Sequence, residues 1–260
     1  MQRLCLGRIH ADMVTFEGAI TAIAELIQRG QGGYVVTPNV DHVVLAESDA
    51  ELRAAYDDAS LSLVDGMPLV WLSRLVGARF PEKVSGSDLA LPLLERAARE
   101  GWRVFFLGAA PGVGARAAEV VQAMLPTLQI VGLDAPPRGF ECDPVASAEA
   151  LERVRASRPD LVLVALGCPL QELLMHRWRA ARHRPWPWAW AGPWTSWRAS
   201  SDARRPGCRA SGSSGATACG RTRGAWHSAT WCAIARSWAL PGACCVRRAA
   251  PCSSTTGGSL

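Results

Sequence analysis

Short apolar runs alternate along this chain with longer segments in which apolar residues recur at helical spacing. Phe16, Ile20 and Ile23, for example, share one face of a helix predicted over residues 16–29. Strands that alternate with helices form parallel sheets, and nearly continuous apolar runs are typical of strands buried on both faces. The sequence therefore predicts an α/β fold with a doubly wound, mainly parallel sheet. Its strands are expected at residues 34–37, 61–64, 103–108, 128–131 and 161–166.

The alternation stops near residue 180, where the composition changes abruptly. Residues 1–180 carry 17 basic and 22 acidic side chains, whereas residues 181–260 carry 11 arginines and one acid, Asp202. The second stretch also holds eight of the 11 tryptophans and six of the nine cysteines, but only four valine, isoleucine or leucine residues. A hydrophobic core cannot be built from that composition. We therefore predict one folded domain over residues 1–180 and a Trp/Arg/Cys-rich tail over residues 181–260 that is mostly disordered.

Simple features of the sequence disfavour several classes of protein. No apolar run approaches the roughly 18 residues of a membrane span, and the N-terminus lacks the apolar segment of an export signal. The cysteines form no C-x-x-C pair, and the histidines and carboxylates have no metal-ligand spacing. We therefore expect a reduced, cytoplasmic protein without a structural metal.

Polar residues or glycines follow four of the predicted strands, at the ends where parallel sheets bind their ligands. One apolar run stops at Asp65, which can take a proton from a substrate hydroxyl or simply cap the next helix. The glycine-rich turn at residues 108–114 can bring backbone N–H groups to a phosphate, but a tight turn explains it equally well. It matches neither G-x-G-x-x-G nor a P-loop. Between these two motifs, Ser87 or Asp88 is predicted to cap a helix that ends at residue 100.

The other two strand ends carry side chains that can bind a ligand or stabilise a helix. Thr37 and Asn39 follow the first predicted strand, and Gln171 follows the last. Asn39 is also a good helix cap, and Gln171 could be solvated in the first turn of a helix. His42 is more typical of a packing or surface histidine than of a base.

Four motifs lie at these strand ends in a defined order. They read Thr-Pro-Asn-Val-Asp-His from Thr37, Val-Asp-Gly-Met around Asp65, Phe-Leu-Gly-x-x-Pro-Gly-Val around Gly108 and Leu-Gly-x-Pro-x-Gln-Glu around Gln171. Together they closely resemble the WecB/TagA/CpsF family of bacterial glycosyltransferases, over about residues 5–180. The resemblance implies a Rossmann-like domain. It also implies transfer of an N-acetylhexosamine, N-acetylmannosamine in the best-known members, from a UDP-sugar to a polyprenyl-diphosphate-linked sugar.

The resemblance further implies a set of partners. The donor substrate would be a UDP-sugar, and no cofactor or metal is expected for the chemistry. A lipid-linked acceptor implies a cytoplasmic enzyme that is peripheral at the inner face of the cell membrane. Its product would enter wall teichoic acid, enterobacterial common antigen or capsule. No nucleic-acid partner is expected, and formation of a homo-oligomer stays open.

Individual residues receive roles from the same resemblance. Asp65 matches the family's proposed general base, which takes the proton from the acceptor hydroxyl as its oxygen attacks and inverts the anomeric carbon. Thr37 and Asn39 match positions that line the sugar pocket, and Gln171 matches a polar group that faces the same cleft. The turn at Gly108 would border the nucleotide.

The chain departs from the family pattern at two places. Cys168 and Leu170 stand where alanine and lysine are more usual, which removes one positive charge near the diphosphates. Beyond residue 183, the family has a strand reading Val-Gly-Val-Gly-Gly-Ala-x-Asp and then an arginine-bearing appendage that reaches the membrane. Neither is present in this sequence.

A shifted reading frame would restore the missing strand. Tryptophan has the single codon TGG, so a frame that starts at the third base of each codon converts Trp188-Ala189 and Trp190-Ala191 to glycines and Trp194-Thr195 to aspartate. We therefore predict a frame slip near residues 180–184 and an out-of-frame tail. The present chain is then expected to lack a core strand, to fold weakly at the edge of its sheet and to transfer little or no sugar. Sequencing the gene across codons 175–190 tests this hypothesis.

Three other interpretations stay open. The first is a nucleotide-binding oxidoreductase on a similar sheet, although no G-x-G-x-x-G follows the first strand. The second is that the tail forms a membrane or nucleic-acid arm, although it lacks apolar periodicity. The third is that the chain is a non-functional truncated copy.

Overall fold

The computed structural model describes residues 2–30, 32–75, 77–180 and 188–191. Its strands are β1 (Arg3–Leu6), β2 (Ile9–Asp12), β3 (Gly33–Val36), β4 (Leu61–Ser62), β5 (Arg103–Gly108), β6 (Gln129–Asp134), β7 (Leu161–Ala165) and β8 (Trp188–Ala191). Its helices are α1 (Phe16–Gln28), α2 (Val40–Ser48), α3 (Ala50–Asp58), α4 (Met67–Leu75), α5 (Gly86–Glu100), α6 (Val113–Met124), the short 3-10 helix η1 (Phe140–Cys142), α7 (Pro144–Ala156) and α8 (Leu170–Ala180).

Six of the described strands form one sheet, in the order β4-β3-β8-β7-β5-β6. Every neighbouring pair in it is parallel. The α/β class and the parallel sheet predicted from the sequence are confirmed. Because the strands are parallel, all their carboxyl ends lie along the same edge of the sheet.

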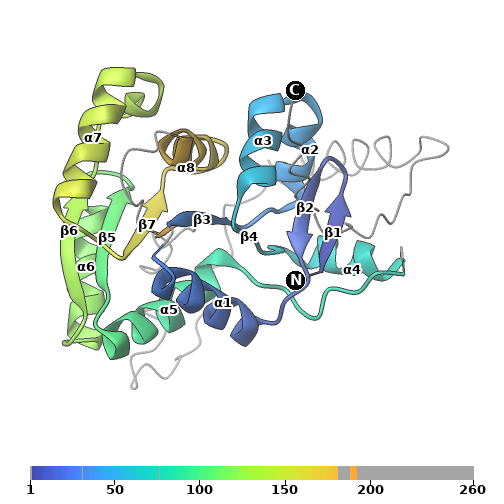
Figure 1. The fold of residues 1–260 in the computed structure, drawn as a ribbon, viewed down its shortest axis with the longest axis horizontal. Coiled ribbons are helices and arrows are strands. Elements are labelled where there is room, and N and C mark those ends of the chain that lie inside the picture. Colours follow the sequence, from blue (N-terminus) through green and yellow to red (C-terminus); the bar gives the residue numbers. More distant parts are fainter. Residues whose placement is uncertain (1, 31, 76, 181–187, 192–260) are drawn as a thin grey trace, which may run out of the picture.

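Alternate side chains of β3, β5 and β7 enter two different hydrophobic cores. Phe105 and Leu107 of β5 pack in one core with apolar residues of α2, α3, α7 and α8. Val104 and Phe106 pack in the other with residues of α1, α5 and α6. Helices therefore cover both faces of the sheet (Figure 1), which explains why its strands read as continuous apolar runs.

The segment Trp188–Ala191 forms β8 in the middle of the sheet, between β3 and β7. The expectation that the chain lacks a core strand is therefore wrong, whereas weak folding at the sheet edge stays a prediction. Parallel pairing uses backbone N–H and C=O groups, which all four residues of this proline-free segment supply. The sheet thus takes one strand from beyond the domain end predicted at residue 180. The rest of the predicted tail, at residues 181–187 and 192–260, lies outside the described residues.

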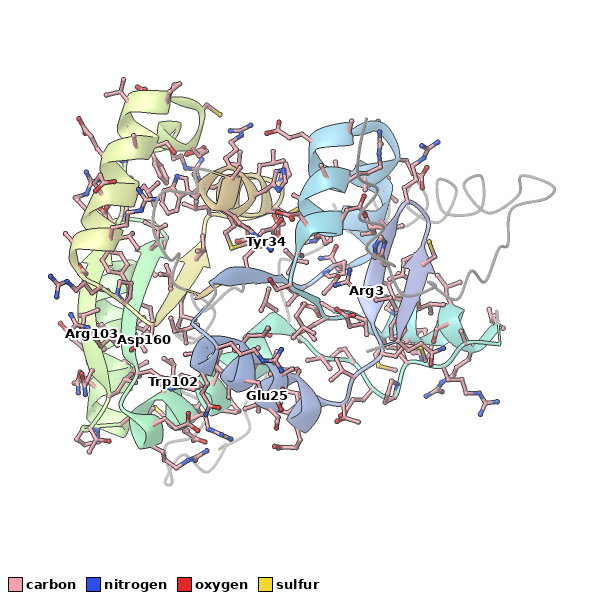
Figure 2. The ribbon with its side chains drawn as sticks, viewed as in Figure 1. Arg3, Glu25, Tyr34, Trp102, Arg103 and Asp160 are labelled. Atoms are coloured by element: carbon pink, nitrogen blue, oxygen red, sulfur yellow. The ribbon has the colours of Figure 1, made fainter. Side chains whose placement is uncertain are left out.

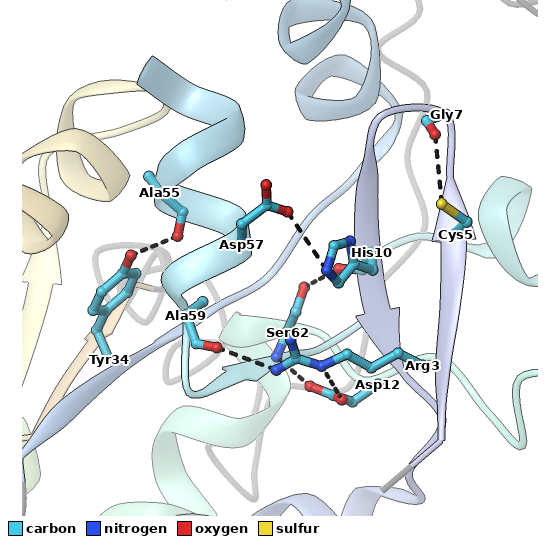
Figure 3. Close-up of polar contacts among 10 residues, drawn as sticks. All are labelled: Arg3, Cys5, Gly7, His10, Asp12, Tyr34, Ala55, Asp57, Ala59 and Ser62. Atoms are coloured by element: carbon cyan, nitrogen blue, oxygen red, sulfur yellow. Dashed lines mark hydrogen bonds and ion pairs between the residues drawn. The ribbon is translucent and has the colours of Figure 1, made fainter. Parts of the chain in front are cut away.

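An antiparallel hairpin of β1 and β2 is hydrogen-bonded to Ser62 of β4 (Figure 3). The buried carboxylate of Asp12 accepts hydrogen bonds from Nε of Arg3 at 2.9 Å and from the backbone N–H of Ser62 at 2.8 Å. The hydroxyl of Ser62 donates to the carbonyl oxygen of His10 at 2.6 Å. These contacts fix β4 three residues before Asp65. The sequence analysis missed this hairpin, whose strands are only four residues long.

At the amino ends of β5 and β7, two residues join the strands. Asp160 Oδ2 accepts from the backbone N–H of Arg103, and the N–H of Asp160 donates to the carbonyl oxygen of Arg103, both at 2.8 Å (Figure 2). Because this pair aligns the starts of the two strands, it also aligns their carboxyl ends, where Gly108 and the turn before Gln171 lie.

Candidate active site

Residues predicted for the site follow four strand ends along one edge of the sheet. In sheet order these ends belong to β4, β3, β7 and β5, with β8 between β3 and β7. The residues that follow them are Asp65, Thr37 with Asn39, Gln171, and Gly108 at the end of β5 itself. The fold therefore brings segments that are more than 130 residues apart in sequence to a common edge.

Asp65 is held against the loop that follows β3. Its backbone N–H donates to the carbonyl oxygen of Pro38 at 2.8 Å, which continues the pairing between β3 and β4. Its carboxylate Oδ2 accepts a hydrogen bond of 3.1 Å from the hydroxyl of Ser85. The side chain is half-buried, so one part of the carboxyl group is oriented by the protein while another can meet a ligand.

The environment of Asp65 favours a base that is stronger than an ordinary aspartate. Burial raises the pKa of its carboxyl group, while the hydrogen bond from Ser85 and the positive charge of Lys83 oppose the rise. Lys83 itself forms an ion pair of 2.8 Å with Asp88. A perturbed carboxyl group at a strand end of this kind is suited to proton transfer.

Ser85 is a site residue that the sequence analysis missed. It occupies the N-cap position of α5, where Ser87 or Asp88 was predicted, but makes no side-chain cap hydrogen bond. Its hydroxyl is used instead for Asp65 and for a contact of 3.0 Å with the hydroxyl of Ser87. A serine before a helix is normally interpreted as a cap, so local sequence carried no signal for this role.

Thr37 and Asn39 lie in the loop between β3 and α2. Thr37 is buried, and Asn39 is partly exposed. The side-chain oxygen of Asn39 accepts from the backbone N–H of His42 at 3.2 Å, so the helix-cap interpretation is confirmed. Sugar binding by either residue stays a prediction.

Gln171 is buried in the first turn of α8, which makes the solvated alternative wrong. Its Oε1 accepts from the backbone N–H of Gly167 at 3.2 Å. Its Nε2 donates to Oε1 of Glu172 at 3.0 Å. Gln171 therefore stabilises the turn between β7 and α8, and its predicted part in a ligand cleft stays untested.

Gly108 ends β5 with a positive φ of 91°, and any Cβ at this position would lie 2.7 Å from the carbonyl oxygen of Ala165. The tight-turn interpretation is thus confirmed, because only glycine allows β5 to approach the end of β7 so closely. Gly112, four residues on, precedes α6 and provides no side-chain cap. The first N–H groups of α6 therefore have no side-chain cap, as at helix N-termini that bind phosphate.

His42 is a buried histidine in the first turn of α2. Its Nδ1 lies 2.5 Å from the hydroxyl oxygen of Tyr56, and burial lowers the pKa of the imidazole to about 4. His42 is therefore neutral at physiological pH, and its burial confirms the packing interpretation. It lies beside Cys168 and Glu172, which are 126 and 130 residues further along the chain. No ligand spacing in the sequence could have indicated this proximity.

The arrangement as a whole defines an α/β protein of the kind that binds ligands at the carboxyl edge of a parallel sheet. Comparison with known proteins specifies the class. Residues 4–192 match the model of the glycosyl transferase WecG/TagA/CpsF family, and the chain belongs to that family. The resemblance noted in the sequence is confirmed, and the match extends through β8.

One similar protein is the N-acetylglucosaminyldiphosphoundecaprenol N-acetyl-beta-D-mannosaminyltransferase of Bacillus spizizenii. It is 33% identical to this chain over 153 residues, which cover 59% of the chain and 57% of the relative. The chain thus spans less than two thirds of the length of that relative.

Proposed function

We propose that this chain contains the core of an inverting glycosyltransferase. It would move an N-acetylhexosamine, N-acetylmannosamine in particular, from a UDP-sugar to a polyprenyl-diphosphate-linked sugar. The observation that carries the proposal is the half-buried carboxylate of Asp65, oriented by Ser85 at the carboxyl end of β4. Family membership and the name of the Bacillus spizizenii relative, which acts on a lipid-linked sugar, support it. In this proposal the sheet is Rossmann-like and doubly wound.

Asp65 would act as the general base. Its carboxylate takes the proton from the acceptor hydroxyl while that oxygen bonds to the anomeric carbon, and UDP departs from the opposite face with the electrons of the broken bond. Such base catalysis is worth about 10²–10⁴-fold. The ordered N–H groups at the start of α6 would donate hydrogen bonds to the diphosphate. Thr37, Asn39 and Gln171 would position the sugars, and no metal would be needed for the transfer.

A lipid-linked acceptor requires the site to approach a membrane surface. None of the helices that the structure describes has the length and apolarity needed to cross a membrane. Helix α4, however, begins two residues after Asp65 and exposes Met67, Trp71 and Leu75 at four-residue intervals, with exposed fractions of 39%, 54% and 83%. We propose that this apolar stripe contacts lipid and presents the site to the acceptor, in keeping with a peripheral enzyme at the inner membrane face.

The transfer is tested with UDP-N-acetylmannosamine and a diphosphoundecaprenol-linked N-acetylglucosamine. Two proteins are compared: the present chain, and a version in which the codons from residue 184 onward are read in the shifted frame. We expect product from the frame-restored protein and little from the present chain. Asp65→Asn in the frame-restored protein should lower turnover about 10²–10⁴-fold, whereas Glu152→Gln, which alters an exposed carboxylate of α7, should not. Full turnover by Asp65→Asn would disprove the assignment of the base.

The oxidoreductase alternative is tested by ligand binding. UDP should raise the melting temperature of the chain and NAD should not, because no dinucleotide fingerprint follows β3. Stabilisation by NAD alone would favour the alternative.

A further inference from the structure

Three side chains lie close together below the surface, in elements that follow the carboxyl ends of β3 and β7. They are His42 from α2, Cys168 from the turn after β7, and Glu172 from α8. One ring nitrogen, the thiol sulfur and one carboxylate oxygen all lie within 4.8 Å of one another. Glu172 is fully buried, His42 nearly so, and Cys168 partly, so the group lies largely in the protein interior.

One oxygen of this group lacks a satisfactory partner. Oε1 of Glu172 accepts from Gln171, but the buried Oε2 has no partner of ordinary hydrogen-bond geometry among the described residues. The thiol of Cys168 approaches the same carboxylate but is a weak donor. Because an unsatisfied buried carboxylate oxygen is unfavourable, each such atom in a folded protein requires an explanation.

We propose that His42, Cys168 and Glu172 bind a thiophilic divalent cation of the zinc class. Imidazole nitrogen, thiolate sulfur and carboxylate oxygen are the three donor types that zinc takes from proteins. In a tetrahedral site, bond lengths of about 2.0–2.3 Å separate the donor atoms by about 3.3–3.8 Å, so small side-chain movements bring the three atoms into range. One thiolate and one carboxylate would balance the double charge, and the proton displaced from the thiol would pass to solvent.

Neighbouring side chains already orient two of the ligands. Nδ1 of His42 lies 2.5 Å from the Tyr56 hydroxyl oxygen. With the Nδ1–H donating to that oxygen, Nε2 would be the nitrogen that binds the metal. The amide of Gln171 holds Oε1 of Glu172 at 3.0 Å, which leaves Oε2. Metal-binding histidines and carboxylates commonly have such outer partners. A water molecule would complete the coordination.

The cation would connect two loops at the carboxyl edge of the sheet. His42 follows the loop that carries Asn39, and Cys168 lies in the turn that Gln171 stabilises. The metal would therefore hold these loops in place without touching the reacting sugars. This inference does not depend on the proposed transferase activity.

The test measures metal binding by the purified full-length chain. The protein is treated with a chelator, exchanged into metal-free buffer and titrated with Co²⁺, which reports a thiolate ligand through a sulfur-to-cobalt charge-transfer band. Because the tail contains six further cysteines, Cys168→Ala is compared with the matched variant Cys142→Ala, which removes an exposed cysteine. Bound zinc is counted by elemental analysis in all three proteins.

We expect the chain to bind one more equivalent of metal than Cys168→Ala, with a charge-transfer band that Cys168→Ala loses and Cys142→Ala retains. Zinc should raise the melting temperature of the chain and of Cys142→Ala, but not of Cys168→Ala. Alanine is the more usual family residue at this position, so the variant is expected to fold, which circular dichroism checks. Glu172→Gln should weaken binding at least tenfold. Equal metal content and equal bands in the chain and Cys168→Ala would overturn the proposal.

Discussion

The hydroxyl of Ser85 donates a hydrogen bond of 3.1 Å to Oδ2 of Asp65, although the two residues are 20 positions apart. Ser85 thereby connects the start of α5 to the end of β4. The hydrogen bond stabilises the ionised carboxylate, as does a second hydrogen bond from the backbone N–H of Gly86. Burial and the hydrogen bond from Ser85 act on the pKa of Asp65 in opposite directions, so the two effects can be separated by mutation.

The first prediction concerns the pH dependence of transfer. Protonation of Asp65 abolishes a general base, so kcat/KM should fall on the acid side, with a midpoint above the ordinary aspartate range because burial raises the pKa. Ser85→Ala removes a hydrogen bond that lowers this pKa, so the midpoint should move to still higher pH. The pH profile of the frame-restored protein measures both effects. The control is Ser87→Ala, which removes a hydroxyl that contacts Ser85. An unchanged midpoint in Ser85→Ala would contradict the prediction.

A second prediction concerns stability. A carboxyl group whose pKa is raised in the folded state stabilises the fold most at pH values below its unfolded pKa, and this contribution is lost as the pH rises through the folded pKa. At neutral pH the ionised Asp65 is therefore unfavourable, and Asp65→Asn should unfold at an equal or higher temperature while losing activity. The difference should shrink in melting curves recorded at low pH. A clear loss of stability at neutral pH would show that the carboxylate is structural.

The buried carboxylate of Asp12 is predicted to stabilise the β1–β2 hairpin on β4. Asp12→Ala leaves Arg3 and the backbone N–H of Ser62 without their partner, so the free energy of unfolding should fall by about 1–3 kcal/mol. Denaturant titration measures it. The control is Glu47→Ala, which breaks the more exposed pair with Arg8 and should cost less than about 1 kcal/mol. Similar losses in both variants would contradict the assigned role.

Gly108 and Gly112 offer a matched pair of substitutions. Both have positive φ, so alanine at either position is expected to cost about 1–2 kcal/mol of backbone strain. At Gly108 the new Cβ would also meet the Ala165 carbonyl oxygen at 2.7 Å, whereas no atom lies within 4 Å at Gly112. Gly108→Ala should therefore destabilise the chain clearly more than Gly112→Ala in thermal unfolding. Equal losses would mean that the approach of β5 to β7 is not close in solution.

The apolar stripe of α4 is predicted to bind lipid. Trp71→Ser should weaken binding to uncharged phosphatidylcholine vesicles about tenfold, which corresponds to about 1.4 kcal/mol of apolar burial. Uncharged lipid minimises the contribution of the arginines in the tail. Met124→Ser, which alters an equally exposed residue at the end of α6, should bind as the unaltered chain does. Unchanged binding by Trp71→Ser would exclude this surface.

Many elements could be predicted because their signals are local. The spacing of Phe16, Ile20 and Ile23 indicated α1, and β5 lies at the residues predicted for it. Pro144 begins α7 as a first-turn proline, and Gly101 ends α5 in the left-handed conformation. Each of these features depends on residues within one or two turns of the chain, so the sequence expresses them directly.

The candidate site was predicted less completely. Asp65 lies where the apolar run ends, and the motifs around it correctly indicated the family. Ser85 was missed because its hydroxyl acts on a different element. The burial of Gln171 was missed because a first-turn glutamine is usually solvated, whereas here Gly167 and Glu172 supply partners for its amide.

The sequence by itself determined that this chain forms alternating strands and helices, where most of them begin and end, and which family it joins. Only the tertiary structure decided that β8 inserts between β3 and β7, that Ser85 meets Asp65, and that His42 lies beside Cys168 and Glu172. The physical reason is that helices and strand runs arise from local periodicity. The order of parallel strands instead depends on backbone pairing and on burial on both faces of the sheet. Residues far apart in the sequence contribute to both.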